Sequence, residues 1–416
     1  MLFGAFFTGQ TKEPNKFVFL HYKMENKKQI IYLDNNATTQ IDKRVLDAMM
    51  PFLTNEFANA NSTHLFGVYA YEAVKSARVQ VSELIGAEAH EIVFTSGSTE
   101  AINLAIKGVA ENYKSKGKHI VTVSTEHSAV LDSCQYLETK GFDVTYMTVK
   151  SDGLIDLDEI KTLLRDDTIL VTVMLANNET GVIQPIKEIA ELSHEVGALF
   201  MSDTTQAVGK IPVNVDELDI DLLCLSGHKL NAPKGVGALY VRQRVNRVKI
   251  PALLHGGGHE KGLRSGTLNV PGIVALGEAC AIAKRELLKN SESIGTLRDY
   301  LETELLKIDG TSVNGNIENR LYNTSNIIFR GADSDAIIMG LSNPENDLPL
   351  IAVSNGSACT SASIEPSHVL TAMGLDEVTA FSSIRFSVGK FNTKKEVEIV
   401  IDSVKNVVSN LRSMVF

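Results

Sequence analysis

The chain has 416 residues, 44% of them hydrophobic and 22% charged, a composition typical of a globular protein with two or three domains. A formal net charge of −10 argues against general affinity for nucleic acid or for an anionic membrane. No apolar run reaches the roughly 20 residues that a transmembrane helix needs. The cysteines form no CxxC pair, which disfavours a metal cluster or a disulfide framework and favours a reducing, cytoplasmic location; they are Cys134, Cys224, Cys280 and Cys359.

The first strand-like pattern begins at Ile30, so residues 1–29 are interpreted as a tail, with Met24 as a candidate natural start. Residues 1–7 are apolar but lack the basic leading region of a secretory signal. We expect residues 30–46 to pack with the smaller of two domains.

Short β-rich runs alternate with helical stretches through the first two thirds of the chain. Residues 92–95 have a strand pattern, 96–99 a turn pattern and 100–113 a helix pattern. Further strands are predicted at residues 120–123, 169–175, 198–202, 222–225 and 237–241. Strands separated by helices pair in parallel through crossovers, with helices on both faces of the sheet. The sequence therefore predicts an α/β fold with a large domain over residues 47–290.

The pattern changes after the glycines at residues 256–258. A long amphipathic helix is predicted over residues 273–308, followed by a strand at 326–329 and a helix at 333–341. We expect a smaller α/β domain over residues 291–416. The glycines are not a dinucleotide site, because GxGxxG is absent.

Ligands of open parallel sheets collect at the carboxyl ends of the strands, where three polar clusters fall. The first, residues 96–99, opens a helix and would present free N–H groups and a positive dipole end to a phosphate. The alternative is an ordinary N-cap made by Ser98 or Thr99.

The second cluster, residues 203–206, begins with Asp203, and the third, residues 226–229, ends with Lys229. A carboxylate beside a cationic heterocycle is favoured in its charged form, and a deprotonated lysine amine can form a Schiff base with an aldehyde. Alone, Asp203 would be read as a helix cap and Lys229 as a surface charge. Together with a phosphate cradle, they are the parts that pyridoxal 5'-phosphate (PLP) requires.

The chain resembles the cysteine desulfurases, the NifS/IscS-like PLP enzymes of the class-V aminotransferase family. The matching segments run in family order between residues 32 and 390; they are LDNNATT (33–39), TSGSTE (95–100), TEH (125–127), NNETG (177–181), DTTQ (203–206), SGHK (226–229), RSGT (264–267) and SACTS (357–361). The resemblance implies a fold type I PLP enzyme, with a mostly parallel seven-stranded sheet in the large domain. It also implies a homodimer.

Site roles are carried over position by position from this resemblance. Lys229 would hold the cofactor aldehyde as a Schiff base, Asp203 would pair with the pyridine nitrogen, and Gln206 would hydrogen-bond the phenolic oxygen. His127 would stack on the ring and move protons.

The phosphate and the substrate complete the implied site. Ser98, Thr99, Ser226 and His228 would bind the phosphate, and Thr267 would reach the phosphate of the other subunit's cofactor. Three residues would hold the substrate: Asn178, which also lies at the cofactor, Asn36 and Arg385, whose fork suits a carboxylate. Without the motif, a structural ion pair at a strand end would be an equal alternative for Arg385.

Cys359 is the candidate nucleophile, because a run of small residues surrounds it in a long loop. The other three cysteines are expected in the core. The resemblance implies that L-cysteine is converted to L-alanine, while its sulfur passes to Cys359 as a persulfide. Alternatives are a selenocysteine lyase, another PLP aminotransferase-like enzyme, and a non-catalytic sulfur-relay or scaffold protein.

The sulfur acceptor stays open at this level. Residues 342–350 are longer than in housekeeping relatives, a departure that suggests a specialised donor. Iron–sulfur cluster assembly, tRNA thiolation and DNA phosphorothioation are the candidate pathways, with no direct contact between this chain and nucleic acid or a membrane.

Overall fold

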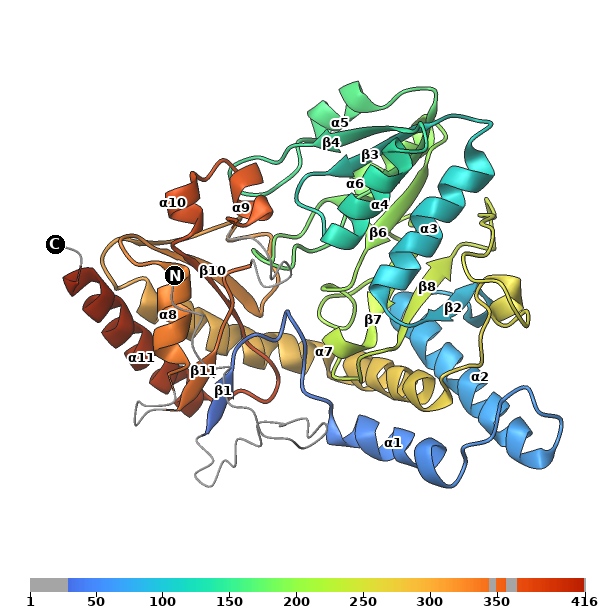
Figure 1. The fold of residues 1–416 in the computed structure, drawn as a ribbon, viewed down its shortest axis with the longest axis horizontal. Helices are drawn as coiled ribbons and strands as arrows, with labels where there is room; N and C mark the ends of the chain where they lie inside the picture. The colour runs from blue at the N-terminus through green and yellow to red at the C-terminus, as the bar shows by residue number, and fades with distance from the viewer. Residues whose placement is uncertain (1–28, 344–348, 357–364, 415–416) are drawn as a thin grey trace, which may run out of the picture.

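The computed structural model describes residues 29–343, 349–356 and 365–414. Its centre is a seven-stranded sheet in the order β2-β8-β7-β6-β5-β3-β4 (Figure 1). The strands are β2 (Ile92–Thr95), β3 (His119–Val123), β4 (Asp143–Met147), β5 (Thr168–Thr172), β6 (Leu199–Asp203), β7 (Leu222–Ser226) and β8 (Gly237–Val241). All are parallel except β8, which runs antiparallel to β2 and β7. The predicted mostly parallel sheet is confirmed.

The antiparallel direction of β8 follows from the short connection that precedes it. Only residues 227–236 separate β7 from β8, and they hold one short turn of 3-10 helix, η2 (Gly227–Lys229). A parallel return needs a crossover of a dozen or more residues. The short connection therefore reverses the chain and lays β8 antiparallel along β7.

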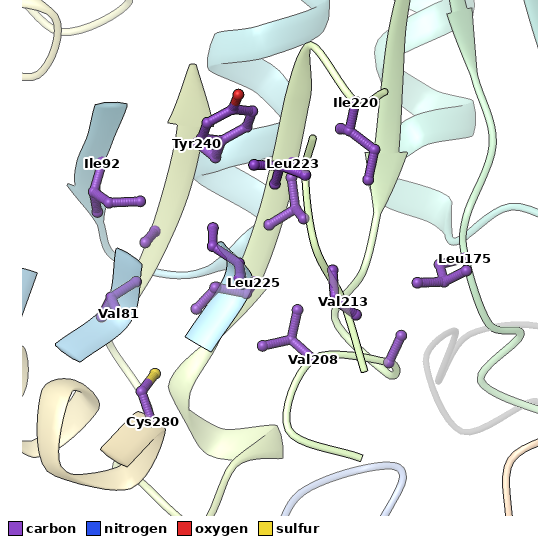
Figure 2. Close-up of a cluster of buried hydrophobic side chains, with 14 of the residues drawn as sticks. Val81, Ile92, Leu175, Val208, Val213, Ile220, Leu223, Leu225, Tyr240 and Cys280 are labelled. Carbon is purple, nitrogen blue, oxygen red and sulfur yellow. The ribbon is translucent and has the colours of Figure 1, made fainter. Parts of the chain in front are cut away.

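Helices cover both faces of this sheet. One face carries α3 (Ser98–Tyr113) and α4 (Ser128–Glu138) in one apolar cluster. The other face carries α2 (Leu65–Ile85), α5 (Leu157–Leu163), α6 (Ile186–Glu195) and the first half of α7 (Val270–Leu305). Figure 2 shows this second cluster, where Leu223, Leu225 and Tyr240 of the sheet lie near Val81 of α2 and Cys280 of α7.

A separate, smaller apolar core lies around the second half of α7 (Figure 1). It is built on an antiparallel sheet of β9 (Thr311–Val313), β10 (Thr324–Phe329) and β12 (Ser383–Ser387). The parallel pair β1 (Ile30–Tyr32) and β11 (Leu350–Ala352) joins this core, together with α8 (Ser334–Leu341) and α11 (Lys394–Ser413). After β1, the chain leaves this smaller core and enters the larger one through α1 (Lys43–Thr54), which packs against α7.

Short elements complete the described chain; they are η1 (Ala89–Glu91), η3 (Glu260–Gly262), α9 (His368–Ala372) and α10 (Glu377–Ala380). No helix among the described residues has the length and apolar character needed to span a membrane. Cys134, Cys224 and Cys280 are free thiols buried in the core, as predicted. Cys359 and most of the predicted 1–29 tail lie outside the described residues, as does part of the 342–350 loop.

Candidate active site

The start of α3 is an open anion-binding end. Its N-cap is Gly97, and no side chain of the described residues caps it. The alternative that Ser98 or Thr99 makes an ordinary N-cap is therefore wrong. Glu100 instead turns back to accept the N–H of Ser96 at 2.8 Å and pairs with Arg264. Within the described part of the chain, the N–H groups of Ser98 and Thr99 have no protein acceptor, and they stand at the positive end of the helix dipole.

The ends of β7 and β8 meet this helix start. A side-chain carbon on Gly237 would lie 2.7 Å from the Cα of Gly97 and 2.6 Å from the carbonyl oxygen of Leu225, so only glycine permits this approach. One placed on Gly97 would lie 3.6 Å from the hydroxyl oxygen of Ser226. The Ser226 hydroxyl therefore lies close to the start of α3, where the N–H groups of Ser98 and Thr99 are free of protein acceptors among the described residues.

His228 comes two residues after the end of β7. Burial lowers the pKa of His228 to about 4, and the charges of Lys229 and Lys234 add to this effect. Its Nδ1 lies 3.2 Å from the hydroxyl of Thr38. At neutral pH the ring is uncharged, so it can offer a phosphate an N–H but no positive charge.

Asp203 ends β6 and is buried. Its Oδ1 accepts the N–H of Thr205 at 2.9 Å and the thiol of Cys224 at 3.3 Å. Among the described residues no donor contacts its Oδ2. The hydroxyl of Thr205, also buried, has no partner in the same set of residues.

Lys229 and Gln206 meet at the N-terminal segment. The ammonium of Lys229 donates to the carbonyl oxygens of Asn36 at 2.5 Å and Ala37 at 2.7 Å. The amide of Gln206 donates to the same Asn36 carbonyl at 2.9 Å. The turn after β1 thus carries the acceptors that bring two predicted cofactor residues together.

Asn178 and Arg385 form the other side of this group. The guanidinium of Arg385 donates to the Asn178 carbonyl at 3.0 Å and pairs with Asp34 at 2.6 Å. The side chain of Asn36 also donates to the Asn178 carbonyl, at 3.1 Å. Arg385 is buried and its Nε has no partner among the described residues, so its fork is only partly used.

The side chain of Asn36 is fully engaged within the protein. Its Nδ2 donates to Asn178 and Thr324, and its Oδ1 accepts from Lys210 and Asn323. Its direct contact with substrate stays a prediction, and these contacts favour a role in orienting its neighbours.

His127 caps α4, and its ring nitrogen Nδ1 accepts the N–H of Ala129 at 3.1 Å. An accepting Nδ1 fixes the proton of the neutral ring on Nε2. Thr267 is exposed on the segment between β8 and α7 and makes no hydrogen bond with the other predicted site residues. The described residues contain no cluster of three or more metal-ligating side chains.

These features suit PLP. The uncapped helix start, Ser226 and His228 match its phosphate, the free oxygen of buried Asp203 matches its ring nitrogen, and Lys229 matches its aldehyde. The N–H groups of Ser98 and Thr99 and the Oδ2 of Asp203, which have no protein partner among the described residues, are the atoms that the phosphate and the ring nitrogen of the cofactor would engage.

Comparisons with known proteins decide the family. The model of the aminotransferase class-V family matches residues 31–400. A cysteine desulfurase IscS of Histophilus somni (strain 2336) is 52% identical over 387 residues, which cover 92% of this chain and 94% of the relative. The chain belongs to the cysteine desulfurases of the class-V aminotransferase family.

Solved structures of similar proteins agree with this membership. A NifS-like protein superposes with a TM-score of 0.85 at 38% identity, covering 91% of this chain and 99% of the other. The structure titled SspA in complex with cysteine gives 0.76 at 38% identity, covering 87% and 99%. Cysteine desulfurases are PLP enzymes, so the cofactor suited by the site is the one on which the family depends.

Two buried titratable groups that adjoin this desulfurase site were not among the predicted site residues. Lys210 donates to Gln206 at 2.8 Å and to Asn36 at 3.2 Å. Glu126, next to His127, is fully buried, and burial together with the charge of Asp203 raises its pKa well above the usual range. The four-residue spacing from Gln206 to Lys210 was the only available signal for the lysine.

Proposed function

We propose that this cysteine desulfurase moves the sulfur of L-cysteine onto the thiol of Cys359, releases L-alanine, and then passes the sulfur to an acceptor protein. The observation that carries the proposal is the meeting of Lys229, Gln206, Asn178 and Arg385 around the turn at Asn36. These contacts bring an amine, a ring-oxygen donor and a carboxylate fork to one place, as the reaction requires.

The cofactor would be held by residues from several elements. Lys229 would bind its aldehyde, Asp203 its ring nitrogen, and Gln206 its phenolic oxygen, with Asn178 and His127 against the ring. Its phosphate would be held by Ser98, Thr99, Ser226 and His228. Bound PLP supplies an electron sink for the substrate Cα.

Arg385 would take the carboxylate of L-cysteine through its guanidinium. Charge-assisted bonds of this kind are roughly twice as strong as neutral ones. Asn178, whose carbonyl already holds Arg385, would flank the substrate. The similar protein whose title names cysteine as its bound ligand supports this substrate class.

The protein groups then move protons and sulfur. Lys229 Nζ, once deprotonated, would take the proton from the substrate Cα. The thiolate of Cys359 would attack the substrate sulfur, forming an S–S bond while the carbon–sulfur bond breaks. The bonding electrons stay with the carbon, which is protonated to give alanine. His127, with its proton on Nε2, would exchange a proton with a sulfur atom.

The homodimer belongs to the same proposal. Large apolar side chains are exposed along and after α1 and α2; they are Leu46, Met50, Leu53, Phe57, Leu65, Phe66, Tyr69 and Tyr71. An apolar group of this kind supports a protein interface. Across it, Thr267 would reach the cofactor phosphate of the partner subunit.

The acceptor would be a protein of iron–sulfur cluster assembly, tRNA thiolation or DNA phosphorothioation. The thiol that accepts the sulfur must stay reduced, which supports a cytoplasmic location.

Purified protein supplied with PLP and L-cysteine tests the proposal. We expect a yellow protein that forms alanine and sulfide in equal amounts when a thiol reductant is present. Cys359→Ala should keep the colour and lose the sulfur transfer. A colourless wild-type protein, or full activity in Cys359→Ala, would refute it.

A further inference from the structure

Lys210 is a buried lysine that the proposed chemistry does not use. It follows β6 by seven residues and is 8% exposed. Its ammonium donates to the side-chain oxygens of Gln206 at 2.8 Å and Asn36 at 3.2 Å. No carboxylate of the described residues pairs with it.

A buried ammonium without a carboxylate is costly. Burial, together with the nearby charges of Lys229 and Arg385, lowers the pKa of Lys210 to about 7. Lys390 also lines the cavity of about 60 Å³ beside Lys210 and Lys229, but it is paired with Asp42. The two neutral side-chain oxygens of Gln206 and Asn36 are its hydrogen-bond acceptors among the described residues.

The chemistry of the ammonium fixes the orientation of Gln206. A lysine ammonium has three donors and no acceptor, so only the oxygen of an amide can face it. The nitrogen of Gln206 must then point away from Lys210, and one of its hydrogens bonds the carbonyl of Asn36 at 2.9 Å. The other hydrogen is left for a ligand.

We propose that Lys210 is a positioning residue that locks the Gln206 amide with its NH₂ group directed to the phenolic oxygen of bound PLP. This inference rests on the proposed role of Gln206 in cofactor binding. This orientation matters because a Gln206 amide flipped by 180° would present its oxygen to the phenolic oxygen, and a repulsion would replace the hydrogen bond.

The pH titration of the visible absorbance of bound PLP tests this proposal without measuring turnover. A donor to the phenolic oxygen stabilises its deprotonated form. We expect Lys210→Met to raise the titration midpoint by about one pH unit, the size of shift that loss of a close favourable partner produces. Lys187→Met, at an exposed position on α6, is the matched control and should titrate as wild type.

A double-variant cycle separates positioning from a simple effect of charge. If Lys210 acts through Gln206, then Lys210→Met should add no further shift in a Gln206→Ala protein. Shifts that add in the double variant would show that Lys210 acts as a distant charge, and would overturn the proposal. An unchanged midpoint in Lys210→Met would overturn it as well.

Two further measurements keep the outcome clear. Lys210→Gln, which is uncharged and too short to hold Gln206 in the same way, repeats the measurement if Lys210→Met does not fold. Wild-type protein and Lys187→Met must both bind PLP and absorb in the visible range. If they do not, the proposed function fails, whereas a wild-type-like Lys210 variant in a coloured protein refutes only the positioning role.

Discussion

Ser367 donates its hydroxyl to the carboxylate of Glu179 at 2.5 Å, and both residues are buried. On the other side, a side-chain carbon at Gly356 would lie 2.3 Å from the same carboxylate oxygen. Glu179 therefore touches the chain on both sides of residues 357–364, which include Cys359. It also directly follows Asn178, whose carbonyl accepts from Arg385, so one short turn contacts both the proposed substrate residue Arg385 and the chain on both sides of this segment.

Glu179→Gln is expected to slow sulfur transfer while leaving PLP binding intact. The change weakens a charge-assisted bond worth roughly 1.5–3 kcal/mol, so we expect about a 10-fold or larger loss in the rate of alanine formation. Ser367→Ala should act in the same direction. The spectral change of PLP on adding L-cysteine should persist in both variants.

The control for this change is Ser193→Ala, which removes an equally buried hydroxyl bonded within α6. It should leave the rate unchanged. A Glu179→Gln enzyme as fast as wild type would contradict a role for Glu179 in holding the Cys359 segment.

The sequence located much of the sheet but not every direction within it. The strand patterns at residues 92–95 and 237–241 coincide with β2 and β8. The direction of β8 depends on the length of the connection after β7 and not on the strand's own residues, and the predicted bounds 222–225 and 237–241 already show that this connection is short. The strands β4 and β12 were missed, since β4 is half-exposed and β12 mixes serines with Arg385.

The site could be predicted where its residues follow strands. Asp203 and Lys229 each lie at the carboxyl end of a parallel strand, which sequence pattern and motif both indicate. The burial of Lys210 and Glu126 could not be predicted, because charged residues are mostly exposed and only the tertiary packing shows which of them are buried. Asn36 illustrates a finer limit, since only the structure reveals that its amide is saturated by the protein.

Gly237→Ala is expected to disturb the proposed phosphate site at the start of α3. The added carbon would meet the backbone of both Gly97 and Leu225, neither of which can move like a side chain. We expect a loss of roughly 1–3 kcal/mol in the free energy of unfolding and weaker PLP binding. Equilibrium dialysis with PLP and urea denaturation measure the two effects.

Gly295→Ala is the matched control for Gly237→Ala. Gly295 lies inside α7, and an added carbon there would be 3.6 Å from Tyr322, an ordinary contact. Because alanine is favoured over glycine in a helix, this variant should be at least as stable as wild type and bind PLP normally. Equal PLP affinity in both variants would contradict the claim that the close approach at Gly237 shapes the proposed phosphate site.

Arg385→Lys is expected to raise the KM for L-cysteine by about 10-fold or more, because a lysine cannot make the two parallel bonds of a guanidinium fork. Initial rates over a range of cysteine concentrations give KM and kcat separately. Arg320→Lys, which alters a partly buried pair with Glu302, should leave KM unchanged. A normal KM in Arg385→Lys would contradict the proposed role of Arg385 in binding the substrate carboxylate.

Phe66→Asp is expected to separate the proposed dimer. Phe66 is 64% exposed in the single chain and lies in the apolar group along α1 and α2, so a charge there would disfavour a close apolar contact. Sedimentation should report a monomer with reduced PLP binding, since Thr267 would no longer reach a partner. Val378→Asp, at an equally exposed apolar residue on α10, should remain dimeric. A dimeric Phe66→Asp protein would place the interface elsewhere.

His194 should make the stability of the protein depend on pH. Its ring contacts Asp221 at 2.8 Å and Asp219 at 2.9 Å, and these carboxylates, Asp221 foremost, raise the pKa of His194 above its usual value. Between the unfolded and folded values, the folded protein binds more protons than the unfolded chain, so its stability falls as pH rises. The contribution of His194 is complete below about pH 6.5, the usual histidine value, and is lost as pH rises through the folded value.

We expect the difference in urea midpoint between wild type and His194→Gln to shrink over this range, whereas His90→Gln, at an exposed histidine, should show no such trend. A difference that stays constant with pH would show that the His194 ring is bonded in its neutral form.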